Sequence, residues 1–230
     1  IIFDTERGKV VLIRLLEEVG CDFLCDTLVT DVVMKDNKLI ALVINSKSGT
    51  QVIKANAFVD STGDCDIAHM CGVPCKTGTF KSSYNFRLGN VNIDNFVKYF
   101  QDNPGTYPDY MDINWTFKEA LAHYRQTGTF LFPHGGSIQL EIIKKGIANG
   151  SYPAEYGLFT ALDAVQMHGI RELKTVNFVS PFTEINALDI RKISKAMSEG
   201  KEIAYIIADY YRKHVPGFEN CFVHSLADDL

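Results

Sequence analysis

The sequence predicts a mixed α+β or α/β fold in two parts, in which a helix and a three-stranded β-meander precede a longer mixed region. Apolar residues at three- and four-residue spacing indicate a helix near the start of the chain and a longer one near its end. Between residues 28 and 60, runs rich in β-branched residues are separated by Asp36-Asn37 and Ser48-Gly49, which are typical turn pairs. Beyond residue 76 the pattern changes, and this places the boundary between residues 1–77 and 78–230.

The first part is expected to begin with a helix that Asp4 or Thr5 caps and Gly20 ends. Its apolar positions share one helical face: Val10, Ile13, Leu16 and Val19. The strands predicted after it cover residues 21–24, 28–34, 39–45 and 52–60. The last of these ends at Thr62-Gly63, and a short helix around residues 67–71 stops at Gly72.

The second part is expected to contain a strand over residues 81–91 and helices near residues 93–100, 116–125 and 137–148. Residues 158–167 and 174–179 are predicted as paired strands joined through His168-Gly169. The strongest helix comes late, with one apolar stripe: Ile190, Ile193, Met197, Ala204, Ile207 and Tyr211. Gly200 falls on this stripe, where it permits close packing or a bend. The tyrosines of this helix are interpreted as packing residues: Tyr205, Tyr210 and Tyr211.

Composition excludes several classes of protein. With 230 residues, 46% hydrophobic and 22% charged, the chain is typical of a globular protein that buries a substantial core. Its net charge of -5 and the lack of a basic block argue against a nucleic-acid partner. No apolar run reaches the roughly 20 residues that a membrane span requires. Six cysteines and no secretory leader favour reduced thiols in a cytoplasmic protein.

The most informative stretch runs from Ala57 to Asp64 and reads Ala-Phe-Val-Asp-Ser-Thr-Gly-Asp. A strand that ends in small residues lets a large ligand approach the backbone, and Gly63 has no side chain to obstruct it. In open α/β sheets, ligands bind beyond the carboxyl ends of the strands. An acidic residue such as Asp64 can accept hydrogen bonds from sugar or ribityl hydroxyls. Taken alone, an ordinary strand-to-helix turn is the more common source of this pattern.

The order of helix, β-meander and Ser61-Thr62-Gly63-Asp64 resembles the FAD-dependent oxidoreductases of the glutathione-reductase-like flavoprotein superfamily. The likeness is specific over residues 4–78, where a bacterial group has a similar strand end followed by Gly-x-Pro, as in Gly72-Val73-Pro74. It continues at Pro216-Gly217-Phe218-Glu219. The resemblance implies an FAD cofactor that contacts Thr62 and Gly63, with Asp64 as a weaker candidate. It also implies a contact from Val29, on the strand that meets the adenine.

The chain departs from the superfamily pattern at the phosphate site. No Gly-x-Gly-x-x-Gly lies between a strand and a helix, and the acidic ribose ligand and the segment that completes the isoalloxazine site are also missing. We therefore expect an internal portion of a longer flavoenzyme, with a partial FAD-binding domain over residues 1–77 and a substrate domain over 78–230. This portion alone is expected to bind FAD negligibly and to be inactive. Its unpaired strand edge is expected to cause self-association.

The other candidate site residues are cysteines, histidines and an arginine. Cys65, Cys71 and Cys75 with His69 lack the spacing of structural zinc ligands, so no metal is predicted. Cys21 and Cys25 miss the redox Cys-x-x-Cys spacing by one residue. His134 fits either a position near substrate at a helix amino terminus or, as the more common case, a surface loop with Ser137 as the helix cap. Arg171 fits either a carboxylate contact or a solvated hairpin tip. None of them identifies a catalytic residue.

Two main hypotheses remain. In the first, the longer enzyme binds FAD and transfers hydride or electrons to or from a small organic substrate, with the chemistry supplied mainly by the flavin. In the second, the chain is a cofactor-free α+β binding module, and the strand end is only a turn. A flavin-independent enzyme using His134 or Cys75 has no specific support.

Overall fold

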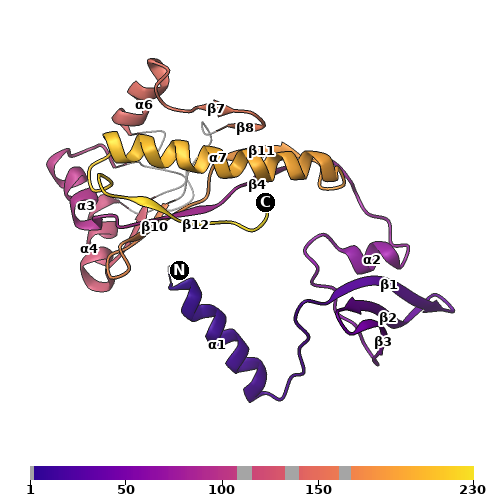
Figure 1. The fold of residues 1–230 in the computed structure, drawn as a ribbon. Coiled ribbons are helices and arrows are strands. Elements are labelled where there is room, and N and C mark those ends of the chain that lie inside the picture. Colours follow the sequence, from indigo (N-terminus) through magenta and orange to yellow (C-terminus); the bar gives the residue numbers. More distant parts are fainter. Residues whose placement is uncertain (1–2, 108–115, 133–139, 161–166) are drawn as a thin grey trace. The chain divides into compact units, whose positions relative to one another are not determined.

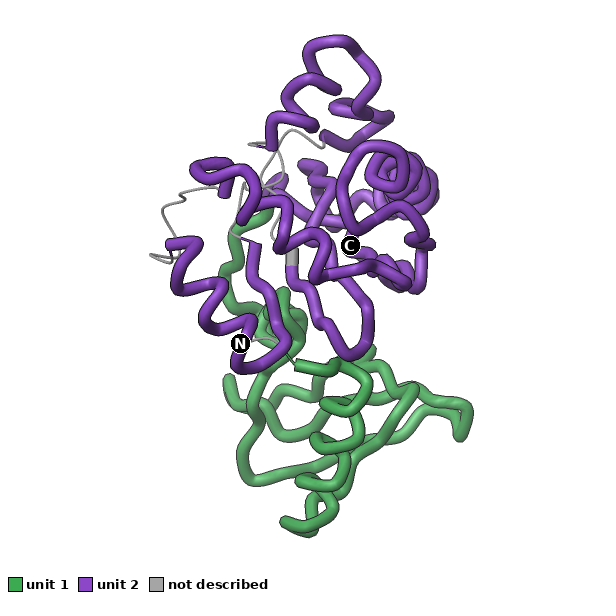
Figure 2. The backbone as a smooth tube through the Cα atoms, turned by 90° about the vertical axis from the view of Figure 1, so that its left-hand side faces the viewer, with its two compact units in different colours: residues 1, 3–77 green, residues 2, 78–230 purple. Residues whose placement is uncertain are grey.

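The computed structural model describes residues 3–107, 116–132, 140–160 and 167–230, and they divide into two compact units (Figure 1). Phe3–Thr77 forms the first unit and Gly78–Leu230 the second (Figure 2). Three sheets and several helices, the longest near the carboxyl end, confirm the predicted α+β class.

The first unit contains helix α1 (Thr5–Glu18), an antiparallel sheet in the order β1-β2-β3, and a short helix α2 (Asp66–Met70). The strands are β1 (Leu28–Lys35), β2 (Lys38–Ser46) and β3 (Gly49–Lys54). The predicted cap is confirmed, because Asp4 Oδ1 accepts hydrogen bonds from the amides of Glu6 and Arg7. The predicted meander is confirmed as well, with tight connections at Asp36-Asn37 and at Lys47-Ser48.

Two strand predictions in this unit are wrong. Residues 21–24 form no strand, and the third strand of the meander ends at Lys54 rather than at Asp60. Residues 57–62 therefore lie outside any strand. Their β-branched and aromatic composition favours extended backbone, but a strand also needs a neighbour to accept its hydrogen bonds. Because β3 pairs with β2 only as far as Lys54, residues 57–62 have no such neighbour in this sheet.

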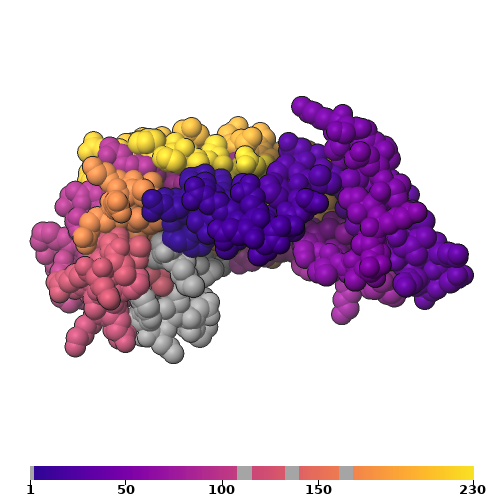
Figure 3. Space-filling view, turned by 90° about the horizontal axis from the view of Figure 1, so that it is seen from below, coloured from indigo at the N-terminus to yellow at the C-terminus, as the bar shows by residue number. Residues whose placement is uncertain are grey.

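The first unit buries little apolar surface. Its fully buried hydrophobic side chains are Ala41, Ile44 and Ile67. Helix α1 buries none of its residues, and its apolar side chains lie at the surface (indigo in Figure 3). A helix is normally stabilised by packing an apolar face, so α1 keeps an uncovered face in the described part of this chain. Self-association stays a prediction, but residues 57–62, whose unpaired strand edge is expected to cause it, form no strand in this unit.

The second unit contains two further antiparallel sheets. The larger has the order β12-β5-β10-β9-β6, and its strands are β12 (Phe222–Leu226), β5 (Phe86–Gly89), β10 (Thr175–Phe178), β9 (Met167–Ile170) and β6 (Thr129–Phe132). The smaller has the order β4-β11-β8-β7, with β4 (Phe80–Ser83), β11 (Phe182–Ile185), β8 (Phe159–Thr160) and β7 (Glu155–Tyr156). The helices are α3 (Ile93–Asp102), α4 (Phe117–Thr127), α6 (Glu141–Ala148) and α7 (Ile190–His214).

The helices of this unit agree with those predicted from the sequence, whereas several of the strands differ from the prediction. The strand predicted over residues 81–91 is interrupted, and its halves β4 and β5 join different sheets. The predicted turn at His168-Gly169 lies inside β9, and the chain turns at residues 171–174 instead. Strand β8 covers only Phe159–Thr160, and residues 161–166 lie outside the described residues. The same holds for 137–139 at the start of the helix predicted over 137–148, which begins at Glu141.

An aromatic core lies on one face of the five-stranded sheet. Phe96 of α3 contacts Phe130 and Phe132 of β6, while Phe178 of β10 contacts Tyr211 of α7. Helix α7 runs along both sheets in Figure 1 and contacts β12, β11 and β8. Together, α3 and α7 cover this face of the sheet.

Gly200, the glycine on the apolar stripe of helix α7, lies in close contact with Tyr84. A Cβ added to Gly200 would lie 2.5 Å from Cγ of Tyr84, so the glycine permits close packing, one of the two roles expected for it. Tyr210 and Tyr211 are buried as predicted. The packing role predicted for Tyr205 is wrong, because its side chain is 55% exposed on the opposite side of the helix.

Candidate functional site

The segment from Asp60 to Ala68 forms a hydrogen-bonded turn around one carboxylate. Asp60 Oδ1 accepts from the Thr62 amide at 3.0 Å and from the Thr62 hydroxyl at 2.8 Å. Asp60 Oδ2 accepts from the Ala68 amide at 2.9 Å, which ties the turn to α2. Thr62 Oγ1 in turn accepts from the Asp66 amide at 2.8 Å at the start of that helix. The turn is therefore ordered by its own side chains although no strand precedes it.

Gly63 lies at the exposed point of this turn. Its φ of +88° falls in the left-handed region that favours glycine, and no heavy atom lies within 4 Å of the position a Cβ would take. Cys65 also has a positive φ, of 60°. The backbone at Gly63 is thus uncovered in this unit, and its contact with a cofactor stays a prediction. The side chains of Thr62 and Asp64 are both exposed beside it.

Val29, the fourth predicted cofactor residue, lies on β1 of the same unit and is half-buried. A β-bulge falls between Val29 and Asp31, and Thr30 Oγ1 donates to the carbonyl of Val43 at 3.4 Å. Helix α2 contacts β1, so the strand that carries Val29 and the helix that follows Gly63 pack together. The structure places all four predicted residues in one unit, and the hydrogen bonds of the Asp60–Ala68 turn do not include Val29.

Asp60 organises the turn, and it was not among the site residues predicted from the sequence. The predicted strand assigned it an ordinary alternating position, whereas the pair Asp60-x-Thr62 is a typical side-chain-to-backbone turn pattern. That spacing could have identified it. The hydrogen bonds from Ala68 and then from Thr62 hold the pKa of the Asp60 carboxyl below its ordinary value, because they stabilise the charged form.

The turn is expected to open in acid. Since the folded pKa of Asp60 is below the unfolded value, the stabilisation by its carboxylate is complete above the unfolded pKa and is lost as pH falls through the lower folded value. Amide signals of Thr62 and Ala68, followed by NMR as pH is lowered, should stay constant until about pH 4 and then move together.

The matched variant for this titration is Asp60→Asn, which keeps an oxygen acceptor but removes the titrating carboxyl. In that variant the Ala68 amide should no longer respond to acid, although the neighbouring carboxyls of Asp64 and Asp66 are unchanged. An Ala68 signal that titrates equally in both proteins would show that Asp60 does not control the turn.

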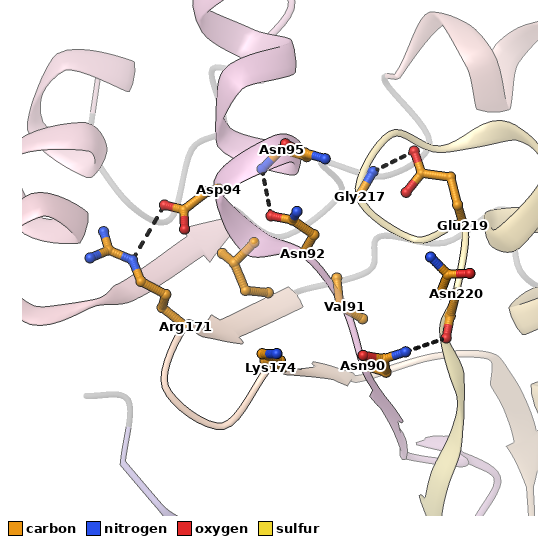
Figure 4. Close-up of a pocket in the computed structure, with 11 residues that line it drawn as sticks. Asn90, Val91, Asn92, Asp94, Asn95, Arg171, Lys174, Gly217, Glu219 and Asn220 are labelled. Atoms are coloured by element: carbon orange, nitrogen blue, oxygen red, sulfur yellow. Dashed lines mark hydrogen bonds and ion pairs between the residues drawn. The ribbon is translucent and has the colours of Figure 1, made fainter.

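A polar pocket lies in the second unit at the start of α3 (Figure 4). Its volume is about 390 Å³, and its wall combines the start of α3 with the β9–β10 turn and the loop after α7. Asn92 caps α3, with Oδ1 accepting from the Asn95 amide at 3.0 Å. The Gly217 amide donates to Glu219 Oε1 at 3.0 Å, and the Asn92 amide donates to the Gly217 carbonyl at 2.7 Å. The Pro216–Glu219 segment thus holds the beginning of α3 in place.

Arg171 at this pocket is paired within the chain. Its Nε lies 3.3 Å from Asp94 Oδ1 and donates to the Tyr124 hydroxyl at 3.0 Å, while Tyr124 donates to the same Asp94 oxygen at 2.8 Å. The guanidinium also lies over the Tyr124 ring, 4.3 Å from its centroid. Burial, with the bond to Asp94, raises the pKa of Tyr124 to about 12. Arg171 therefore links the β9–β10 turn to α3 and α4.

The other weighed candidates do not assemble into a site. Within the residues that the structure describes, no three His, Cys, Asp or Glu side chains converge as metal ligands. Cys65 and Cys75 carry exposed free thiols, and Cys71 is half-buried. Cys21 and Cys25 are also exposed free thiols. His134 lies outside the described residues.

The fold and the turn define a two-unit α+β protein whose first unit presents an open glycine between a meander and a short helix. A family model for FAD-dependent oxidoreductases matches residues 1–230. The chain belongs to this FAD-dependent oxidoreductase family, which confirms the resemblance inferred from the sequence.

Among solved structures, a triple mutant of the flavin-dependent brominase Bmp2 is similar, at 12% sequence identity and a TM-score of 0.41. The alignment covers 92% of this chain and 40% of the brominase, so the chain spans less than half of that structure. Comparison with curated proteins gives no match. Across the described ranges, none of the helices has the length and apolar character needed to cross a membrane.

Proposed function

We propose that this chain is an internal portion of a longer FAD-dependent oxidoreductase that exchanges hydride or electrons with a small organic substrate. In this proposal Phe3–Thr77 is part of the FAD-binding domain and Gly78–Leu230 is the substrate domain. Thr62 and Gly63 contact the cofactor, Asp64 accepts hydrogen bonds from its hydroxyls, and Val29 approaches the adenine. The flavin supplies the redox chemistry, while the protein positions it.

The open backbone at Gly63 is the observation that carries the assignment of the turn. A planar cofactor needs a stretch of main chain without a side chain in its path, and Gly63 has free space where a Cβ would be. Asp60 holds Thr62 and α2 in fixed positions on either side of this glycine. The residues present therefore fit a dinucleotide that lies against the turn. The family match supports FAD as that dinucleotide.

The full-length protein tests this function. Purified from its natural gene, it should be yellow and show the visible absorption of bound flavin. Gly63→Val in that protein should lower the flavin content at full protein recovery by at least about tenfold, because the isopropyl group occupies the space that the cofactor needs.

Gly72→Val is the matched control, since Gly72 has a φ of +81° in the same unit and open space at its Cβ position. It carries the same backbone strain but lies beyond α2, so it should retain the flavin. A colourless full-length protein that refuses added FAD would favour the cofactor-free binding module. Equal flavin loss in both variants would remove Thr62 and Gly63 from the cofactor site.

A further inference from the structure

The polar pocket at the start of α3 is held together by hydrogen bonds between the segments of its wall (Figure 4). The Val91 amide donates to the Lys174 carbonyl at 2.9 Å and joins the β9–β10 turn to the segment before α3. Asn90 Nδ2 donates to the Asn220 carbonyl at 3.0 Å and joins that segment to the loop after α7. The Gly217 carbonyl accepts from the start of α3 and adds a third link. The pocket is therefore preformed, which lowers the ordering cost of binding.

The charges of the pocket wall balance. Arg171 and Asp94 form an ion pair with each other, with Nε and Oδ1 3.3 Å apart. Lys174 and Glu219 add one charge of each sign. In Figure 4 the Asp94–Arg171 pair and Glu219 lie on opposite sides of the pocket, with Lys174 between them. A wall without net charge favours a neutral ligand over an anion or a cation.

Several polar groups of the wall are available to a ligand. Within the described ranges, the carboxamides of Asn95 and Asn220 make no hydrogen bond, and the exposed Lys174 ammonium makes none either. Asn92 accepts through its oxygen and keeps its NH₂ group, while Glu219 accepts through Oε1 and keeps Oε2. The pocket thus offers hydrogen-bond donors and acceptors together.

The pocket wall presents almost no apolar surface. Val91 and Ile93 are the apolar side chains among its described lining residues, and they are 1% and 2% exposed. The volume of about 390 Å³ lies near the lower end of the range of roughly 300 to 1,000 Å³ for small-molecule sites. The first turn of α3 is already capped by Asn92, so side chains rather than free helix amides define the recognition. These properties favour a small polar ligand.

We propose that this pocket binds a small neutral polyhydroxylated molecule the size of one sugar ring. A sugar hydroxyl donates and accepts hydrogen bonds, as a carboxamide does, so Asn95 and Asn220 can each bond neighbouring hydroxyls through oxygen and nitrogen. The Lys174 ammonium donates to a hydroxyl oxygen, and Glu219 Oε2 accepts from a hydroxyl. A neutral sugar also loses less hydration free energy on entering the pocket than an ion loses. Binding of a sugar here goes beyond the proposed function and does not require flavin.

Glucose, galactose and myo-inositol are the probes, each titrated into the full chain while the asparagine side-chain NH₂ signals are followed by NMR. The signals of Asn95 and Asn220, assigned with Asn95→Ala and Asn220→Ala, should shift in a saturable way with at least one probe. Each of these variants should weaken binding by about 3- to 10-fold, the loss of one or two neutral hydrogen bonds. Asn56→Ala is the matched control, because it removes an exposed carboxamide from the first unit. It should leave the affinity unchanged.

Acetate and ethylammonium are the charged probes, and at equal concentration they should shift these signals less than the sugars. The proposal is overturned if none of the three polyols moves the Asn95 and Asn220 signals. It is also overturned if acetate binds more tightly than the polyols and Lys174→Met removes that binding, since the pocket would then be an anion site. Equal weakening by Asn56→Ala would show a non-specific effect and count against it as well. A colourless full-length protein would overturn the proposed redox function and leave the sugar site standing.

Discussion

Gly217→Ala is expected to destabilise the second unit by at least about 3 kcal/mol. This cost combines strain in the backbone of residue 217 with displacement of the backbone at the start of α3. Gly217 has a φ of +90°, and an added Cβ would lie 2.4 Å from the Asn92 carbonyl oxygen and 2.9 Å from the Phe96 amide nitrogen. Both neighbours are backbone atoms at the start of α3, so neither can rotate away. Thermal unfolding should show a midpoint lower by roughly 6–12 °C.

The control for this substitution is Gly150→Ala in the same unit. Gly150 has a φ of +75° with nothing within 4 Å of its Cβ position, so only the backbone strain remains. It should cost about 1 kcal/mol. If the two variants unfold at the same temperature, the contact between the Pro216–Glu219 segment and α3 does not stabilise the fold.

Phe96→Ala is the second substitution with a large expected effect. Phe96 is 2% exposed, and its ring lies 5.2 Å from Phe218 and 5.7 Å from Phe132, measured between centroids. Truncation removes the buried ring and leaves a cavity between α3 and the sheet, at a cost of about 3–5 kcal/mol. Chemical denaturation followed by circular dichroism should show a lower midpoint.

Tyr205→Ala truncates an aromatic residue that is 55% exposed on α7, and it should change the unfolding free energy by less than about 0.5 kcal/mol. Tyr205→Ala is the control for Phe96→Ala, because both substitutions truncate an aromatic residue on a helix of the same unit. A similar loss in both variants would mean that the aromatic cluster around Phe96 is not the core of this unit.

The helices were predictable because their cause is local. Asp4 before an apolar stripe, and Thr116 three residues before Glu119, supply the caps that the structure contains. Most of the meander was also predictable, since its turn pairs and β-branched runs lie within a few residues of one another. The family resemblance arose from the same short segment and is confirmed over the whole chain.

The strands and sites that depend on distant residues were not predictable. Whether residues 57–62 form a strand depends on a neighbouring strand, and β3 supplies no partner beyond Lys54. His168-Gly169 has the composition of a turn, but pairing on both sides places it in the middle of β9. The hydrogen bond from the Ala68 amide to Asp60 spans eight residues and was not predictable, whereas the local Asp60-x-Thr62 pair could have been identified.

The sequence by itself determined the α+β class and the positions of the capped helices, because both follow from residue patterns and caps within short segments of the chain. Only the tertiary structure decided that Arg87, Asn177 and His168 share one face, and that Gly217 contacts the start of α3. Sheet register and close backbone contacts join residues about 80 to 130 positions apart, and their free energy comes from pairing and packing rather than from local composition.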